Sequence, residues 1–268
     1  DAETMDAIKK HQSAVMFSLK DADISVRRRA LELLFSMCDE SNAVEIVREL
    51  LNFLVADMQI REQMVLKIAI IAERFATDLR WYVDQILQLV SIAGSFVSDD
   101  IWHRAVQIIT NNEALQKYAA QTMFDALEPA RVHETTVKVG GYVLGEFGYL
   151  IGEEEGTSGE EQFAVLTRHI ATVTPPTRAL LLTAFVKMAN LYDGVKPLVR
   201  PVFAKYQVAM DPELQQRAVE YLTLPTLEDP AVMHAVLDAM PPWPAERENA
   251  LLARLKAEKE ETHDRNVW

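Results

Sequence analysis

The sequence predicts an all-α fold, a HEAT/armadillo-like α-solenoid of stacked antiparallel helix pairs. Two observations lead to this prediction. Apolar residues recur at helical spacing in short segments along the 268-residue chain, and alternating β patterns of useful length are absent. The segments also come in pairs joined by short polar turns, with a loose period of about 34–42 residues that suits helix-pair repeats.

Four amphipathic segments account for the first hundred residues. In each of them successive apolar positions fall one, three or four residues apart, which places them on one face of a helix. The four predicted faces are Val26, Ala30, Leu33, Leu34 and Met37; Val44, Val47, Leu51 and Leu54; Ile60, Met64, Ile68, Ile71 and Phe75; and Tyr82, Ile86, Leu89, Val90 and Ala93.

The pairing of helices is visible in a short motif that recurs at two predicted turns. Asp23-Ile24-Ser25-Val26-Arg27 is followed 34 residues later by Asp57-Met58-Gln59-Ile60-Arg61. The Asp either pairs with the Arg four residues on, worth about 0.2–0.5 kcal/mol, or marks the turn and the start of the helix. Further first helices are expected near Asp100, Thr135, Thr177 and Glu213. One pair cannot cover its own apolar face, so roughly six or seven pairs should stack.

The predicted solenoid spans residues 1–245, with one interruption and a tail. Residues 152–161 combine glycine with glutamate and predict an exposed, mobile acidic loop, interpreted as a long repeat insertion. In the second half, prolines such as those at 175, 176, 212, 225 and 230 are expected to begin or end helices. Residues 246–268 are highly charged and are expected to lead toward a hinge that lies beyond this chain.

A glycine-rich stretch, residues 139–148, first suggests a phosphate-binding loop. It contains neither GxGxxG after a strand nor GK[ST], so that interpretation fails. Gly141, Gly145, Gly148 and Gly152 are instead spaced four, three and four residues apart. We therefore expect one helix face on which a second helix can approach very closely, although each glycine costs about 1 kcal/mol of helix propensity.

The charge balance limits the classes of partner. Forty acidic residues against 27 basic ones give a formal net charge of −13. This excess disfavours general binding to DNA, RNA or anionic lipid, which needs basic patches, so we expect protein partners and no nucleic acid. The single cysteine, Cys38, is expected to be a buried core residue in a reducing compartment. No apolar run is long enough for a membrane span, and no signal sequence or initiator Met begins the chain, so we expect an excised cytoplasmic fragment.

The sequence indicates no chemistry of its own. The six histidines are scattered without the clustering that a metal site needs, and no Ser-His-Asp, Cys-His or paired-carboxylate pattern stands out. We therefore expect no enzyme, no metal and no cofactor. Two candidate partner-binding features remain. Arg27, Arg28 and Arg29 form the one compact basic run, and Trp243 is flanked by three prolines and is the best candidate for an exposed aromatic anchor.

Several strings resemble the alpha-adaptin family, the large subunits of the plasma-membrane clathrin adaptor. The resemblance covers about residues 10–255. The most specific string is residues 137–148, Val-Lys-Val-Gly-Gly-Tyr-Val-Leu-Gly-Glu-Phe-Gly. Others lie at residues 23–27, 37–43, 60–62, 65–70, 81–84, 213–222 and 240–244.

The resemblance implies the C-terminal part of an adaptin trunk, a non-enzymatic scaffold in clathrin-mediated endocytosis and vesicle-mediated protein transport. It implies a heterotetramer with a beta-adaptin, a medium and a small subunit, contacts with endocytic regulators or assembly chaperones, and clathrin reached indirectly. The expected location is cytoplasmic, peripheral at the plasma membrane in clathrin-coated pits. The family's main phosphoinositide site and appendage are expected outside this fragment. The alternative is a HEAT-repeat receptor of another class, a nuclear transport or phosphatase scaffold that binds basic peptides along a concave face.

Overall fold

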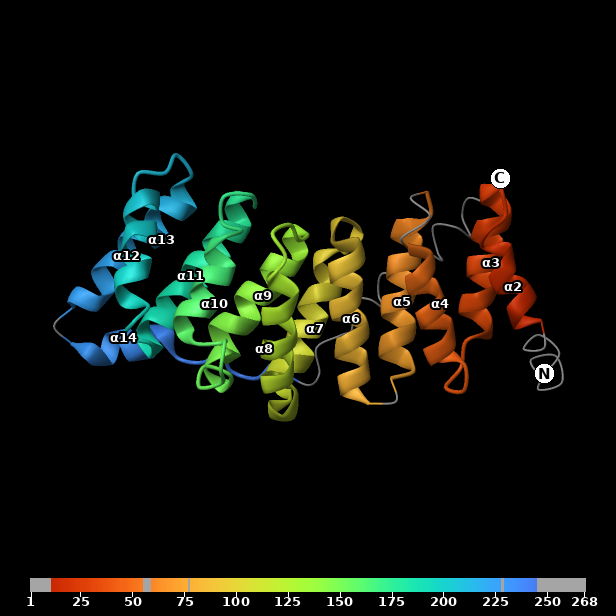
Figure 1. The fold of residues 1–268 in the computed structure, drawn as a ribbon, viewed down its shortest axis with the longest axis horizontal. Coiled ribbons are helices and arrows are strands. Elements are labelled where there is room, and N and C mark those ends of the chain that lie inside the picture. The colour runs from red at the N-terminus through yellow and green to blue at the C-terminus, as the bar shows by residue number, and fades with distance from the viewer. Residues whose placement is uncertain (1–10, 55–58, 77, 228, 245–268) are drawn as a thin grey trace. The chain divides into compact units, whose positions relative to one another are not determined.

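The computed structural model describes residues 11–54, 59–76, 78–227 and 229–244. These residues form thirteen α-helices and three short 3₁₀-helices, and they contain no strand (Figure 1). The prediction of an all-α, HEAT/armadillo-like fold is confirmed. The described residues divide into two compact units, the first before residue 106 and the second over residues 106–243, and helix α7 (Asp99–Asn111) crosses the division.

The first unit is a two-layered stack of helices. In one layer α3 packs on α5, in the other α4 packs on α6, and α5 also packs on both α4 and α6. Its helices are α2 (Gln12–Ser18), α3 (Ile24–Met37), α4 (Ala43–Leu54), α5 (Arg61–Arg74) and α6 (Leu79–Ala93), followed by the 3₁₀-helix η1 (Gly94–Phe96).

The second unit repeats the arrangement. Helices α9, α11 and α13 pack on one another in turn, while α8 and α10 form the second layer and α12 and α14 pack on α11. The helices are α8 (Glu113–Leu127), α9 (Glu134–Phe147), α10 (Gly159–Thr167), α11 (Pro175–Leu191), α12 (Lys196–Tyr206), α13 (Pro212–Thr223) and α14 (Pro230–Leu237), with the 3₁₀-helices η2 (Gly148–Leu150) and η3 (Leu224–Thr226).

The predicted apolar faces are confirmed for α6 and nearly so for α5. All five predicted residues of α6 are buried. Of the face predicted for α5 only Phe75, which follows the last residue of the helix, is partly exposed. The face of α3 is rotated from the prediction, because Val26 and Leu33 are 39% and 47% exposed while Leu31 is fully buried. The buried residues of α3 are Ala30, Leu31, Leu34 and Met37, because α2 and α5 pack on the face that contains Leu31. Val44 of α4 is likewise exposed.

Asp23, the first residue of the recurring motif, marks the start of helix α3. The carboxylate of Asp23 accepts a hydrogen bond of 2.7 Å from the backbone N–H of Ser25, as an N-cap residue does. Asp57, its counterpart, lies outside the described residues. The side chain of Arg27 donates instead to the carbonyl oxygens of Asp21 and Ala22 and to Oε1 of Gln59, so it ties the first turn to the second.

Prolines begin helices in the second unit, as predicted. Pro175, Pro212 and Pro230 occupy the first turns of α11, α13 and α14, where the missing N–H needs no partner. The expected helix starts near Thr177 and Glu213 therefore fall within these first turns.

The acidic loop is exposed but bonded to its surroundings. Residues 153–156 are exposed, and Gly156 takes a positive φ of 85° that glycine adopts without strain. Thr157 Oγ1 donates to the carbonyl of Ile151 at 2.6 Å, and Lys117 Nζ lies 2.7 Å from Oε1 of Glu154. The loop is shorter than predicted, because a capping box between Ser158 and Glu161 starts α10 within it.

The glycine face is confirmed for its first half. A Cβ at Gly141 would meet the side chains of Leu180 and Leu181, and a Cβ at Gly145 would lie 2.9 Å from Cβ and 3.0 Å from Cα of Ala184. Helix α9 therefore packs backbone against backbone on α11 at this point.

The prediction of a single four-glycine helix face is wrong for Gly148 and Gly152. Helix α9 ends at Phe147, where the chain tightens into the 3₁₀-helix η2. These two glycines face other neighbours, the side chains of Gln162 and Tyr192. Both remain positions of close approach, but not on one helix.

Glu134 joins the starts of α9 and α11. Its carboxylate accepts hydrogen bonds from the hydroxyls of Thr174 and Thr177 and, at 3.1 Å, from the N–H of Thr174, the N-cap residue of α11. Burial raises the pKa of Glu134, but these three hydrogen bonds and the charge of Lys138 together outweigh it and hold the pKa below its ordinary value.

None of the helices in the described parts of the chain combines the length and the apolar composition that a membrane crossing requires.

The contact between Gly145 and Ala184 gives the first prediction. Gly145→Ala should destabilise the second unit by about 1–2 kcal/mol, since the methyl group meets backbone atoms that cannot turn aside and this outweighs the gain in helix propensity. Adding Ala184→Gly should make the double variant more stable than the two single effects predict, measured by urea unfolding in a double-mutant cycle. Gly141→Ala, which meets only the ends of leucine side chains, is the control and should cost less. A coupling of zero would contradict this contact.

The hydrogen bonds of Glu134 give a pH prediction. A folded-state pKa below the unfolded one contributes stability that is present above the unfolded pKa and is lost as pH falls through the folded pKa. Glu134→Gln should therefore lower stability by about 1 kcal/mol at pH 7 and make the acid-side loss shallower. Thermal unfolding from pH 7 to pH 3 measures both effects. The control is Glu113→Gln, an exposed glutamate at the first position of α8. Parallel pH curves for the wild type and Glu134→Gln would refute it.

Candidate functional site

The predicted basic run separates into a structural residue and two exposed ones. Arg27 is half-buried and its guanidinium is engaged by the turn before α3 and by Gln59. Arg28 and Arg29 are exposed on the same helix. Only these two therefore have side chains accessible to a partner.

Trp243 is less exposed than the sequence suggested. It is half-buried, and its backbone is held by the side-chain amide of Asn111 at the end of α7. The N–H of Trp243 donates to Oδ1 of Asn111 at 2.7 Å, and Nδ2 of Asn111 donates to the carbonyl of Trp243 at 3.0 Å. Trp243 belongs to the second unit and the three arginines belong to the first.

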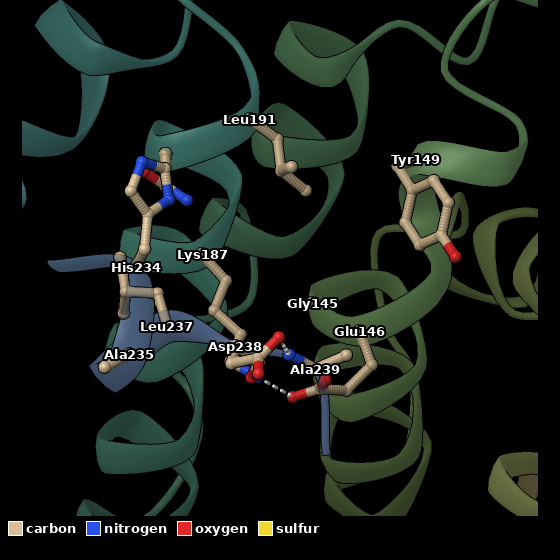
Figure 2. Close-up of a pocket in the computed structure, with 11 residues that line it drawn as sticks. Gly145, Glu146, Tyr149, Lys187, Leu191, His234, Ala235, Leu237, Asp238 and Ala239 are labelled. Atoms are coloured by element: carbon tan, nitrogen blue, oxygen red, sulfur yellow. Dashed lines mark hydrogen bonds and ion pairs between the residues drawn. The ribbon is translucent and has the colours of Figure 1, made fainter. Parts of the chain in front are cut away.

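The most distinctive polar feature of the second unit is an ion pair between α9 and α11. Nζ of Lys187 contacts Oε1 of Glu146, and the two side chains are only 11% and 9% exposed. They follow Gly145 and Ala184 along their helices, so the close approach of the two backbones brings them together. Figure 2 shows them reaching toward each other from neighbouring helices.

The ion pair binds the main chain of a segment that follows α14. We call residues 238–243 the return segment, because in Figure 1 the chain after α14 runs back past α11 and α9. Nζ of Lys187 donates to the carbonyl of Asp238 at 3.1 Å, and the N–H of Met240 donates to Oε2 of Glu146 at 3.2 Å. Each charge thus has both its ionic partner and a main-chain partner.

A groove of about 440 Å³ opens beside the ion pair. Glu146 and Lys187 lie on its floor, and α14 and the start of the return segment form one wall. Tyr149 and Leu191, 51% and 54% exposed, form the apolar rim seen in Figure 2. A second groove of about 420 Å³ continues along α9 and α11, lined by Gly141, Ala184 and Met240 among others. The two grooves adjoin, because both are lined by Glu146, Lys187 and Asp238.

Burial raises the pKa of one group that lines the second groove and of one group in the core of the first unit. Burial raises the pKa of the Tyr142 phenol, with a lowering contribution from the hydroxyl of Thr110 and a raising one from Glu146, so the phenol is neutral at pH 7. In the first unit, burial and the neighbouring Asp39 raise the pKa of the Cys38 thiol to about 12, so it is an inert core residue as predicted. Within the described ranges no three His, Cys, Asp or Glu side chains gather into a metal-binding group.

Sequence reasoning missed Asn111, Glu146 and Lys187. The sequence signal that could have indicated Lys187 is a charged residue inside an otherwise apolar helical segment, Ala184-Phe185-Val186-Lys187-Met188. Such a charge requires a partner when buried. The sequence does not indicate which residue 41 positions away supplies it.

Comparison with known proteins assigns the family. The family described as "Adaptin N terminal region" matches residues 2–229.

The chain belongs to the adaptin N-terminal family.

Relatives of this adaptin include two subunits of AP-2 complexes. It is 49% identical to the AP-2 complex subunit alpha-2 of Dictyostelium discoideum over 249 residues, 92% of this chain and 25% of the relative. It is 48% identical to the AP-2 complex subunit alpha-1 of Arabidopsis thaliana over 271 residues, 99% of this chain and 26% of the relative. Identity to the AP-1 complex subunit gamma of Dictyostelium discoideum is lower, 35% over 91% of this chain. The resemblance to alpha-adaptins is thus supported, and this adaptin spans about a quarter of the length of these relatives.

A solved structure supports the fold. A chain of the "Homology model of the full-length AP-3 complex in an intermediate open conformation" matches with a TM-score of 0.57 at 18% identity. The match covers 95% of this adaptin and 50% of that chain. At this identity the likeness concerns the helical fold alone.

The ion pair gives a stability prediction. Lys187→Met should destabilise this adaptin by about 3 kcal/mol or more, because it leaves the carboxylate of Glu146 buried without its cation. The double variant Glu146→Gln/Lys187→Met should recover most of that loss, since it removes the unpaired charge. Guanidinium unfolding of the two variants and the wild type measures the difference. Equal stability of the single and double variants would contradict a buried, coupled pair.

Proposed function

We propose that this adaptin is the C-terminal part of the trunk of an AP-2-type alpha subunit and acts as a non-enzymatic scaffold. The observation that carries the proposal is the 48–49% identity to AP-2 alpha subunits over 92–99% of the chain. Stacked helix pairs offer long, rigid surfaces, which suit binding by shape and not covalent chemistry. In this proposal the solenoid comprises residues 1–245 with the acidic loop at 152–161, and residues 246–268 lead toward a hinge.

The partners in this proposal are the other adaptor subunits. A beta-adaptin, a medium and a small subunit would bind helix faces of the scaffold, with endocytic regulators or assembly chaperones binding before or after assembly. The complex would work in clathrin-mediated endocytosis, cytoplasmic and peripheral at the plasma membrane in coated pits, with clathrin reached through other subunits. The names of the relatives, subunits of AP-2 and AP-1 complexes, support assembly of this kind.

The family match favours this proposal over the HEAT-repeat receptor of another class. A nuclear transport or phosphatase scaffold would bind a basic peptide along an acidic concave face. The family match covers residues 2–229, and no observation on the second unit favours a basic ligand in particular, because its ion pair contributes one charge of each sign to the groove.

Co-purification tests the scaffold. The tagged chain is co-expressed with a beta-adaptin, a medium and a small subunit, and complexes are isolated and sized by chromatography. We expect at least one subunit to co-purify in stoichiometric amount. If a chain that is helical and unfolds cooperatively captures none of them at micromolar concentration, the adaptor proposal fails for this portion.

The exposed arginines give a sharper test of one surface. If Arg28 and Arg29 contact an acidic partner surface, Arg28→Ala/Arg29→Ala should weaken capture about three- to tenfold and reduce its salt dependence. The control is Arg48→Ala/Arg131→Ala, which removes two other exposed arginines and the same charge. Arg27 is left intact because it holds the turn before α3. Equal capture by both variants would remove the basic run from the interface.

A further inference from the structure

We propose that Asn111, Glu146 and Lys187 form a binding site for the main chain of an extended, proline-containing peptide, and that the return segment is its resident, displaceable ligand. The three residues come from α7, α9 and α11 of the second unit. Their contacts with the return segment involve the carbonyl of Asp238, the N–H of Met240, and both the N–H and the carbonyl of Trp243. This inference does not depend on the adaptor proposal.

The site recognises backbone and not side chains. An asparagine side chain carries an NH₂ donor group and a carbonyl acceptor on the same amide, so it can bind both polar groups of a single residue, as Asn111 does with Trp243. The carboxylate accepts and the ammonium donates, so Glu146 and Lys187 select one N–H and one carbonyl two residues apart. The three side chains thus specify spacing and an extended conformation, whatever the side chains of the ligand.

The sequence of the return segment favours an extended backbone. Met240 precedes Pro241, and Trp243 precedes Pro244; a residue before proline is restricted to β or polyproline II backbone. The two residues that donate N–H groups to the site are therefore both held extended by the proline that follows each. Pro241 and Pro242 lie between the two donors and have no N–H that would need an acceptor. A proline-rich chain also loses little conformational freedom on binding.

The return segment is attached by polar contacts at an exposed surface, so it can be exchanged. Residues 238–242 are all exposed, and Met240, the large apolar side chain among them, is still 42% exposed. Trp243 at the end of the segment is half-buried, so residues 238–242 are the part that opens at low free-energy cost. The buried ion pair has the opposite property: without a segment, each of its charges loses a hydrogen-bonding partner in a place with little access to water. An opened segment therefore leaves polar groups of the site without partners, and a peptide that presents an N–H and a carbonyl in the same places would restore those hydrogen bonds.

The adjoining grooves supply room for a longer ligand. Beyond the ion pair the groove continues between α9, α11 and α14, rimmed by Tyr149 and Leu191. An incoming peptide with apolar side chains on either side of its prolines could bury these two residues, which the return segment leaves about half exposed. The expected ligand class is therefore an extended peptide with a Pro-Pro pair between two backbone N–H donors and an apolar residue beside them.

The resident segment is tested first, in the full chain. Hydrogen exchange followed by NMR should show protection of the Met240 and Trp243 amides. Asn111→Ala should accelerate exchange at Trp243 by about tenfold or more and at Met240 by less, because Glu146 still accepts from Met240. The control is Gln216→Ala, which removes an exposed amide that bonds only within α13. Unprotected amides at both positions in the wild type would overturn the proposal.

Exchange with a peptide in trans is tested second. The probe is a fluorescent peptide with the sequence of residues 236–244, titrated into three full-length forms of the chain. Pro241→Gly/Pro242→Gly should bind it about five- to tenfold more tightly than the wild type, because the glycines loosen the resident segment and leave the site intact. Adding Asn111→Ala to that variant should reduce binding again. A probe with glycines in place of its own Pro-Pro pair should bind more weakly than the parent probe. A parent probe that binds none of the three forms, or binds all three alike, would overturn the proposal.

Discussion

The second unit depends on one steric condition, the absence of a side chain where Gly145 meets Ala184. With only hydrogen at that position, α9 and α11 can pack backbone against backbone. The same approach sets the distance between the residues that follow along each helix, so that Glu146 and Lys187 can form their ion pair. The pair in turn fixes the return segment, and a helix–helix distance therefore determines the course of the chain after α14.

A buried ion pair is an unusual way to join two helices, since removing both charges from water costs free energy that apolar packing would not. Its usefulness lies in its geometry. Apolar side chains could hold α9 against α11, but they could not select an N–H and a carbonyl of an extended segment. Asn111 applies the same principle at the end of α7. These three residues give an otherwise ordinary helix stack a directional binding surface.

This surface bears on how a scaffold of the adaptin family can work. The stack provides rigid layers in which each helix pair covers its neighbour, and binding then depends on what the layers expose. The second unit exposes a groove with a polar floor and an apolar rim, partly covered by its own chain. The first unit exposes Arg28 and Arg29 beside an arginine that is committed to the fold. Both features are surfaces for recognition. Each lies beside residues that stabilise the fold.

The sequence by itself determined the fold class, the positions of most helix starts and the close approach at Gly141 and Gly145, because periodicity, capping residues and prolines act within a few residues of chain. It also indicated the family, through strings such as residues 137–148. It did not determine which face of α3 is buried, since two faces share Ala30 and Leu34 and the neighbouring helices choose between them. Nor could it identify Asn111, Glu146 and Lys187 as one site. Their contacts join residues 41 to 132 positions apart, and only the packing of α9 on α11 and the return of the chain bring those residues together.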